Sequence, residues 1–498
     1  MTRLPDREFL GLSQLLRQAA DRFSANIALV AGERSVTYRE LDQAANGLAC
    51  WFLAQGLCPG DRVAIHWTNS IETVELLLAC VHAGLVAVPI NTRLKPPEVG
   101  YILDRTRPRL CFSQPELASI AGEARGLCPW LPPILTDLPG PLSNGELPAP
   151  SPDAPALILY TSGTTARPKG VIHTHTTVLA SARIMWDTGV DDTAVLVVAV
   201  PLMHASGLTG LALPSLMVGA TLVLIPKFDP GAVLDAVQRH RCTFGFGLPA
   251  MMQFLAAEQQ QRPRDVASLR TWVAGGDSVP VSLQERFLEV FGIPLQEGYA
   301  MTESLAITWN RRDAIRSGSL GRPALGVELQ ARGMDGSVLP YGQVGELAVR
   351  SAANFVGYWN DPKATAASLQ DGWLLTGDLG RIDAEGYLWF AGRSKTVIIR
   401  GGSNIAPQEV EEVLYQHPAV LEVGVIGLPD VTYGESVVAC AVLRDGQCVR
   451  EEELREFTRR RLADYKVPER IVFLSAIPKG STGKVQRDAL KQMVLSGP

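Results

Sequence analysis

A hydroxyl-rich loop between Tyr160 and Gly170 is the part of the sequence best suited to hold an anion. It follows the apolar run Ala156–Leu159, which is typical of a buried strand. Four Ser or Thr hydroxyls, one Gly and one Lys crowd into this loop: Thr161, Ser162, Thr164, Thr165, Gly163 and Lys169. Hydroxyl groups, free backbone N–H groups and a cation together favour an oligophosphate ligand. The loop is not a Walker A motif, and four hydroxyls taken alone would favour an ordinary surface turn.

Other segments of the chain decide between these two interpretations. They are Gly298–Ser304 (Gly-Tyr-Ala-Met-Thr-Glu-Ser), Thr376–Leu379 (Thr-Gly-Asp-Leu), Gly392–Lys395 followed by Gly401-Gly402, and Pro478–Lys484. With the hydroxyl-rich loop, these segments resemble the motifs of the adenylate-forming superfamily, which contains acyl-CoA synthetases, amino-acid adenylation domains and luciferases. They stand in the family's order and cover nearly the whole chain, so the interpretation as a site is favoured.

The resemblance implies that ATP, Mg²⁺ and coenzyme A are used at these motifs. Glu303 would bind Mg²⁺, because this hard cation prefers carboxylate oxygen, and Thr302 would donate to the α-phosphate. Tyr299 would offer an aromatic face to adenine, and Asp378 would accept from the ribose hydroxyls. The full set implied for ATP and coenzyme A is Thr161, Ser162, Gly163, Thr164, Thr165, Lys169, Gly276, Asp277, Tyr299, Asp378, Arg393, Lys395, Gly401 and Gly402.

Lys484 lies in a glycine-containing loop near the C-terminus. The resemblance gives this position to the lysine that meets both the substrate carboxylate and the α-phosphate, and a compact ammonium on a long stem suits that task. It also implies a C-terminal lid that is closed for adenylation and rotated for thioester formation, with its hinge near Lys395. Gly401 and Gly402 would then let the pantetheine arm pass close to the backbone.

His204 matches the histidine that acyl- and aryl-CoA synthetases place beside the acid, although a lone His is more often a hydrogen-bonded core residue. The Asp that amino-acid adenylation domains use for a substrate ammonium is missing here. The expected pocket is small or apolar and consists of His204, Phe246, Gly275, Ala300 and Leu305. No Arg for a second carboxylate is evident within the motifs. An apolar monocarboxylic acid is therefore expected, with a fatty acid favoured.

Three residues depart from the family pattern. Ala166 stands where the phosphate loop usually has Gly, and Ala would be strained there if that position needs a positive φ. Thr396 replaces an acidic residue after the hinge, and Ala300 replaces the usual Gly of the nucleotide motif. None of the three removes a catalytic group, since Lys484, Thr302, Glu303 and His204 are all present.

The elements that must position these residues follow an alternating pattern. Strand-like runs at Val63–Ile65, Val86–Val88 and Trp272–Ala274 alternate with helical patterns such as Ile71 to Val81, which predicts α/β layers with largely parallel sheets. After Gly392 the elements become shorter. We expect a large N-terminal domain of layered α/β subdomains over residues 1–392, and a small mobile α+β lid domain over residues 393–498.

Composition sets the remaining limits. A chain of 498 residues is too long for one ordinary domain, and a net charge of −5 with mixed signs gives no electrostatic footprint for nucleic acid. The N-terminus lacks the apolar core of a secretory signal, and the uncharged stretch from Ala205 to Pro226 reads better as a buried helix, turn and strand than as a membrane span.

The eight Cys contain no Cys-x-x-Cys pair. Buried reduced thiols in a cytoplasmic protein are expected.

The sequence therefore predicts an AMP-forming acyl-CoA synthetase that works through an acyl-adenylate. A stand-alone adenylation enzyme that loads the phosphopantetheine thiol of a carrier protein is the alternative, because both acceptors present the same thiol. A luciferase-like oxygenase and a non-catalytic nucleotide sensor are weaker readings. The sequence does not give the chain length or ring character of the acid, or the oligomeric state.

Overall fold

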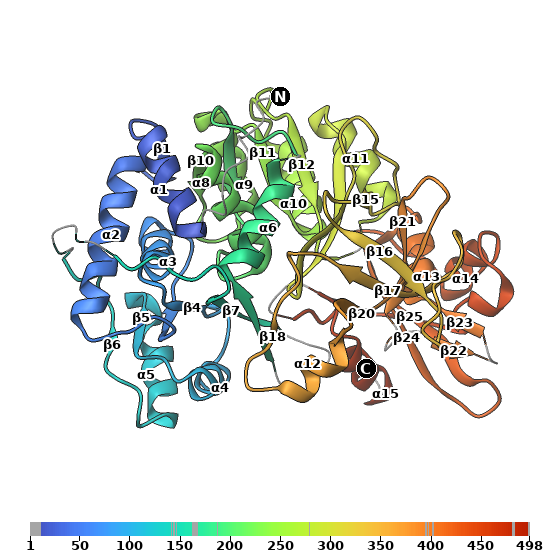
Figure 1. Cartoon of the computed structure of the whole chain (residues 1–498). Coiled ribbons are helices and arrows are strands. Elements are labelled where there is room, and N and C mark those ends of the chain that lie inside the picture. Colours follow the sequence, from blue (N-terminus) through green and yellow to red (C-terminus); the bar gives the residue numbers. More distant parts are fainter. Residues whose placement is uncertain are drawn as a thin grey trace.

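A computed structural model of the chain describes residues 11–140, 142, 145, 147–161, 168–186, 188–277, 279–393, 396, 398–400, 403–480 and 484–496. These residues form four β-sheets with helices packed against them. Figure 1 shows that the elements up to β21 build most of the molecule, while the C-terminal elements, in orange to red, gather at one side. The expected large α/β domain and small C-terminal domain are confirmed.

Two large sheets form the centre of the N-terminal domain, and most of their neighbouring strands run parallel. The nine-stranded sheet has the order β15 (Arg322–Pro323), β14 (Ser304–Trp309), β13 (Leu295–Met301), β12 (Thr271–Ala274), β11 (Phe244–Gly247), β9 (Val195–Val198), β10 (Thr221–Leu224), β1 (Ile27–Ala31) and β2 (Arg34–Thr37). The seven-stranded sheet has the order β18 (Gly357–Tyr358), β8 (Lys169–Thr174), β7 (Pro155–Thr161), β4 (Val86–Pro89), β3 (Arg62–His66), β5 (Leu110–Ser113) and β6 (Ile134–Leu135). This largely parallel arrangement confirms the α/β prediction.

Helices cover these sheets and complete their core. They are α1 (Leu12–Arg22), α2 (Tyr38–Ala54), α3 (Ile71–Ala83), α4 (Pro96–Thr106), α5 (Ala118–Leu127), α6 (His175–Trp186), α7 (Ala205–Gly207), α8 (Leu213–Val218), α9 (Pro230–His240), α10 (Pro249–Gln261), α11 (Val281–Phe291) and α12 (Pro362–Ser368), with short turns η1 (Pro115–Leu117) and η2 (Leu208–Ala212). The predicted helix from Ile71 begins where the Ser70 hydroxyl accepts from the Thr73 N–H, and it ends at Gly84, which has a φ of 70°.

A smaller five-stranded sheet carries the Thr376–Leu379 motif. Its strands are β16 (Glu328–Arg332), β17 (Gly345–Arg350), β20 (Trp373–Ile382), β19 (Leu369–Gln370) and β21 (Leu388–Arg393). The antiparallel register of β20 and β21 sets Asp378 directly opposite Arg393. Two motifs that the sequence separates are thereby joined on one sheet.

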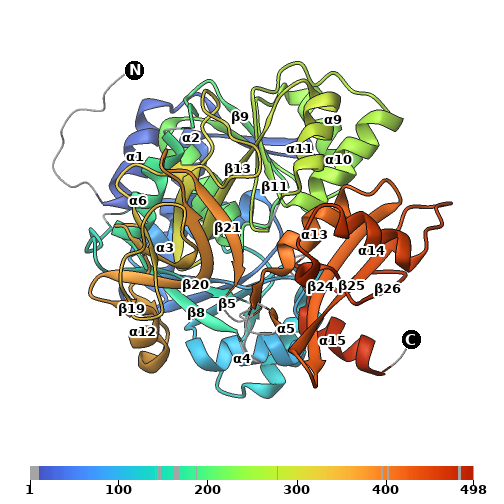
Figure 2. The same ribbon diagram turned by 90° about the vertical axis from the view of Figure 1, so that its right-hand side faces the viewer.

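The C-terminal domain has a sheet and two apolar clusters of its own. Its elements are β22 (Ile398–Arg400), β23 (Ser403–Ile405), α13 (Pro407–Tyr415), β24 (Val420–Asp430), β25 (Gly434–Leu443), α14 (Glu451–Arg459), η3 (Asp464–Lys466), β26 (Arg470–Phe473) and α15 (Arg487–Ser496). Figure 2 shows α13 and α14 directly below α10 and α11 of the large domain. The domain therefore packs against the edge of the large domain that contains α11.

The hydroxyl-rich loop joins two antiparallel strands. β7 ends at Thr161 and β8 begins at Lys169, and the two residues are partners in the register. Glycine is required at position 170, next to Lys169, because a Cβ atom there would lie 2.9 Å from the Ile158 side chain. The loop thus leaves the end of a buried strand, as its sequence predicts.

The uncharged stretch from Ala205 to Pro226 folds into α7, η2, α8 and the strand β10, with the chain reversing at Gly219, whose φ is 90°. The prediction of a buried helix, turn and strand is confirmed. Among the described residues, no helix is both long enough and apolar enough to cross a membrane.

All eight Cys are unpaired in the structure. Five of them are buried, as predicted: Cys80, Cys111, Cys128, Cys242 and Cys440. The expectation of burial is wrong for Cys58 and Cys448, which are exposed because each lies in a connecting segment outside the strands and helices. These two thiols provide one accessible Cys on each domain.

Candidate active site

Tyr299, Asp378 and Arg393 form one hydrogen-bonded group. The Tyr299 hydroxyl donates to Oδ2 of Asp378 at 2.5 Å, and Arg393 Nε pairs with Oδ1 of the same carboxylate at 3.1 Å. Asp378 is buried, so both contacts stabilise a charge that is shielded from water. Burial, and then the Asp378 charge, raise the pKa of Tyr299 well above its usual value, so its hydroxyl keeps its proton. A carboxylate can accept more than two hydrogen bonds, which leaves capacity for a ligand.

Glu303 is anchored by a residue outside the predicted set. The Tyr358 hydroxyl donates to Oε1 of Glu303 at 2.8 Å, and the Lys169 ammonium lies 4.7 Å from the centre of the Tyr358 ring. Tyr358 therefore connects the lysine of the hydroxyl-rich loop to the carboxylate of the next motif. A cation over an aromatic ring is attracted by the ring's negative face, which holds Lys169 in place.

A Mg²⁺ ion fits this arrangement. Mg²⁺ is often held by one or two carboxylates together with water and substrate phosphates, and Glu303 supplies one carboxylate beside the lysine of the loop. Within the described ranges no cluster of three His, Cys, Asp or Glu side chains could hold a metal by itself. The residues present therefore suit an ion that arrives with the nucleotide.

The turn between β13 and β14 carries Thr302 and Glu303. Hydrogen bonds to the backbone carbonyls of both residues hold this turn in place. The buried His173 ring contacts the Thr302 carbonyl through Nε2 at 2.7 Å. The backbone N–H of Phe355 donates to the Glu303 carbonyl at 2.7 Å. Because both carbonyls are bound on the inner side, the turn is held in one position on the sheet.

Lys484 comes from the C-terminal domain and lies among groups of the large domain. Its burial and the Arg393 charge lower the pKa of its ammonium, whereas the carboxylates of Asp277, Asp378 and Glu303 act in the opposite direction. Such charge effects require proximity. The structure therefore places Lys484 where the charges of Asp378 and Glu303 act on it, although the three residues come from three separate motifs.

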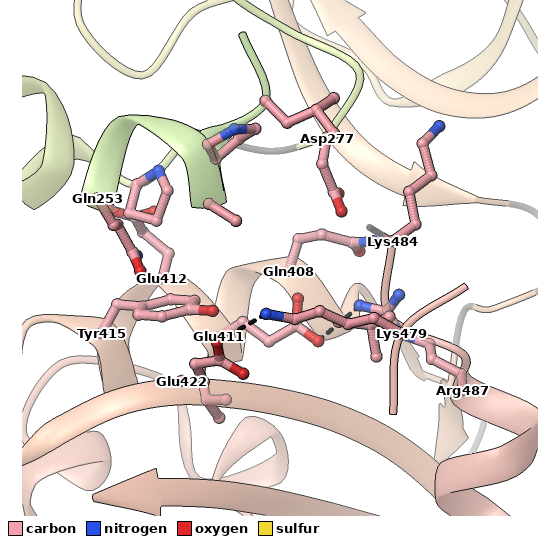
Figure 3. Close-up of a pocket in the computed structure, with 16 residues that line it drawn as sticks. Gln253, Asp277, Gln408, Glu411, Glu412, Tyr415, Glu422, Lys479, Lys484 and Arg487 are labelled. Atoms are coloured by element: carbon pink, nitrogen blue, oxygen red, sulfur yellow. Dashed lines mark hydrogen bonds and ion pairs between the residues drawn. The ribbon is translucent and has the colours of Figure 1, made fainter. Parts of the chain in front are cut away.

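Lys484 is also one of the residues that line a cleft between the two domains (Figure 3). Leu248, Gln253, Asp277 and Pro280 line it from the large domain. The opposite wall comes from the C-terminal domain and is lined by Gln408, Glu411, Glu412, Tyr415, Glu422, Val423, Lys479, Lys484, Val485 and Arg487. Figure 3 shows the Lys484 side chain pointing away from the C-terminal domain, on the side where Asp277 lies.

The hairpin that carries Lys484 is tied to its own domain. Arg487 donates to Oε1 of Glu411 at 2.5 Å and to the Val425 carbonyl at 3.2 Å, and Lys479 pairs with Glu422 at 2.6 Å. Burial raises the pKa of Glu411, and the Arg487 charge beside it has the opposite effect. Lys484 must therefore move with the domain as a whole.

His204 lies near the N-terminus of α7, where its Nε2 is 3.5 Å from the Asn91 side-chain nitrogen. Burial lowers the pKa of His204 to about 4, and the positive charges of Arg93 and Lys484 add to this effect. The histidine is therefore neutral at pH 7.

The remaining pocket residues lie on adjacent strands of the nine-stranded sheet. Phe246 is on β11, and Gly275 follows β12, where an added Cβ would lie 3.2 Å from the Gly298 carbonyl and 3.7 Å from the Phe246 ring. Ala300 is exposed on β13, whereas Leu305 on β14 is buried. Gly276 has a φ of 84°, which only Gly adopts readily, so it lets the chain turn into Asp277.

Several predicted residues lie outside the described part of the chain. They are Ser162, Gly163, Thr164, Thr165, Ala166, Lys395, Gly401 and Gly402. Thr161 and Lys169 are described at the two ends of the loop, and Thr396 is described just after the proposed hinge. Their roles remain predictions.

Two residues of the site carry no signal in the sequence. Tyr358 reaches Lys169 only because β18 pairs with β8 across a long stretch of chain. His173 lies under Thr302 because β8 runs beneath the turn after β13. Both contacts depend on which strands lie next to each other in the fold, so a linear sequence motif could not predict them.

The chain is similar to known enzymes over most of its length. Residues 16–359 match the family model described as AMP-binding enzyme, and residues 409–484 match the model of its C-terminal domain. Feruloyl-CoA synthase of an Amycolatopsis species is 38% identical over 93% of this chain and 94% of that protein. The long-chain-fatty-acid–CoA ligase FadD13 of Mycobacterium tuberculosis is 36% identical over 92% of this chain and 93% of that protein.

A solved structure supports the same fold. The anthranilate CoA ligase AuaEII in complex with anthranoyl-AMP matches with a TM-score of 0.92 at 30% identity, and the match covers 97% of each chain. Both domains are therefore arranged much as in a ligase that holds an acyl-adenylate.

Proposed function

The chain belongs to the family of AMP-binding enzymes and is an acid–thiol ligase, and we propose that it activates an apolar monocarboxylic acid with ATP and transfers it to coenzyme A. In the first step the carboxylate attacks the α-phosphorus, forming acyl-AMP and releasing pyrophosphate. In the second step the thiol of coenzyme A attacks the acyl carbon, forming the thioester and releasing AMP and a proton. Catalysis by adenylation follows from the family, and the residues assigned below are our proposal.

The placement of Lys484 carries this proposal. The charges of Asp277, Asp378 and Glu303, which all belong to the large domain, act on its ammonium. Lys484 itself belongs to the C-terminal domain. This is the arrangement that adenylation needs, because negative charge develops between the acid and the α-phosphate. Lys484 would meet that charge without a further movement of the domain.

The large domain would orient the nucleotide. Asp378 would accept hydrogen bonds from the ribose hydroxyls, while Tyr299, fixed by its bond to Asp378, would present its ring to adenine. Thr302 and Lys169 would donate to phosphate oxygens. Mg²⁺, held by Glu303 and the phosphates, would neutralise charge on the leaving pyrophosphate.

For the second step we propose that the C-terminal domain turns about a hinge near Lys395, with the domain boundary between residues 392 and 393. The rotation would remove Lys484, which is tied to this domain through Arg487 and Glu411. It would open the acyl-adenylate to the thiol, with Gly401 and Gly402 beside the pantetheine arm.

An apolar acid is favoured by the surroundings of the acyl end. Phe246, Leu305 and the neighbouring glycines offer no charge, and neutral His204 provides polarity near the carboxyl group. Arg93 is the cation in this region that could favour a second acidic group, but it is exposed. We favour a fatty acid, while the aromatic acids of similar ligases make an aryl acid the main competitor. The same similarity to CoA ligases disfavours the carrier-protein alternative.

A two-stage assay tests the proposal. Pyrophosphate release is measured with fatty, aromatic and dicarboxylic acids, and each active acid is then assayed for thioester formation with coenzyme A and with a phosphopantetheinylated carrier protein. We expect release with apolar monocarboxylic acids and transfer to coenzyme A. A preference for dicarboxylic acids, or transfer to the carrier protein alone, would contradict the proposal.

A further inference from the structure

A hydrogen bond connects the two domains at the start of α11. Oε1 of Glu412, in α13 of the C-terminal domain, accepts from the backbone N–H of Val281 at 2.9 Å. Val281 is the first residue of α11, so its N–H has no partner within that helix. Figure 2 shows α13 beneath α11, which agrees with this contact. Glu412 thus supplies a partner for this N–H from the other domain.

A second carboxylate, which belongs to the large domain, binds the chain just before α11. Glu297, buried on β13, accepts from the Val279 N–H at 3.2 Å and from the Gln284 side chain at 3.1 Å. The segment from Val279 to Val281 is therefore held by one carboxylate from each domain. It follows Asp277, whose charge acts on Lys484. The interdomain bond is thus only a few residues from the site.

We propose that Glu412 is a positioning residue whose bond to Val281 holds the C-terminal domain in the orientation that delivers Lys484. The inference rests on the proposed two-step function. Glu412 touches no reacting atom, so it acts through the placement of Lys484. If the domain turns away for the second step, the bond to Val281 breaks and no longer matters.

The test separates the two half-reactions. Glu412→Ala is expected to slow single-turnover acyl-AMP formation about tenfold, which corresponds to about 1.4 kcal/mol. The thioester step from supplied acyl-AMP and coenzyme A is expected to stay within about twofold of wild type. Glu412→Gln should recover part of the loss, because its amide oxygen can still accept from Val281.

Glu409→Ala is the matched control. Glu409 lies on the same helix, but its carboxylate pairs with Lys466 of its own domain at 2.5 Å. It should leave both half-reactions unchanged, and a melting curve of each variant confirms folding. Equal losses in both half-reactions of Glu412→Ala, or equal losses in the control, would overturn the proposal.

A distance measurement tests the orientation without any acid. Spin labels on the exposed Cys58 and Cys448 report one position on each domain, in a background with Cys50 replaced by Ser. We expect Glu412→Ala to broaden the distance distribution and the control Glu409→Ala to leave it unchanged. Identical distributions in all variants would overturn the inference. If no acid released pyrophosphate, the proposed function would fail while this measurement still decided the role of Glu412.

Discussion

The hydroxyl of Tyr299 donates a 2.5 Å hydrogen bond to the carboxylate of Asp378, although the two residues are 79 positions apart in the chain. The bond joins the proposed adenine-binding residue to the proposed ribose-binding residue. Any change in one therefore alters the orientation of the other. The nucleotide site is best regarded as one unit built on two sheets.

Tyr299→Phe tests this link. The variant keeps the aromatic ring but removes a hydrogen bond to a buried charge, so we expect the KM for ATP to rise about tenfold while the KM for the acid changes little. Tyr387→Phe is a matched control, because it removes another buried tyrosine hydroxyl, which donates to the Ala314 carbonyl at 2.9 Å, and leaves Asp378 intact. Unchanged KM for ATP in the Tyr299 variant would show that the bond does not organise the site.

His204→Ala tests the position of the acyl end. Because the histidine is neutral and lies beside Asn91 and Arg93, we expect acid use to fall while ATP affinity without acid barely moves. Equilibrium titration with ATP, together with kcat/KM for the acid, separates the two effects. A large loss of ATP affinity would place His204 at the nucleotide instead.

The sequence predicted much of this architecture, since alternating strands and helices follow from apolar periodicity alone. Motifs also predicted that Glu303, Asp378 and Lys484 share one site, and the charges of both carboxylates do act on Lys484, while the roles of these residues remain predictions. Tyr358 and Glu412 could not be predicted. Tyr358 depends on the pairing of β18 with β8, and Glu412 depends on the packing of one domain against the other. Such contacts are set by tertiary structure.

Buried histidines should make the fold sensitive to acid. Burial lowers the pKa of His66, His173 and His175 to about 4, and that of His82 to about 3. The unfolded chain binds protons at these groups below about pH 6.5, whereas the folded chain does so only near pH 4 or below. Stability should therefore fall as the pH drops from about 6.5 to 4, because the unfolded state binds more protons in this window.

Denaturant titrations at several pH values measure the slope of the unfolding free energy against pH. His66→Gln should make it shallower by about 1.4 kcal/mol per pH unit, the contribution of one group. Ser113→Ala removes the partner that lies 3.3 Å from His66 Nδ1 but keeps the histidine, so its slope should match wild type. Equal slopes for wild type and His66→Gln would refute the assignment.

Ala300→Gly tests the shape of the acyl pocket. If Ala300 lines the acyl pocket as proposed, its methyl group would take up space where a ring or an α-branch would lie, whereas a linear chain could bend past it. We expect the variant to raise kcat/KM for aromatic and α-branched acids relative to linear acids, within the range of about 10- to 200-fold for such small volumes. Unchanged relative preferences in the folded variant, or a wild-type preference for aryl acids, would contradict this expectation.

Lys484→Ala tests the central claim, which is that the C-terminal domain delivers this lysine for adenylation alone. Lys479→Ala is the control on the same hairpin, because Lys479 pairs with Glu422 inside its own domain. The measurement is single-turnover kinetics of both half-reactions, the second started from supplied acyl-AMP and coenzyme A. We predict that Lys484→Ala abolishes acyl-AMP formation and leaves thioester formation intact, while the control retains both. An equal fall of the two half-reactions in a folded Lys484→Ala variant would contradict the account.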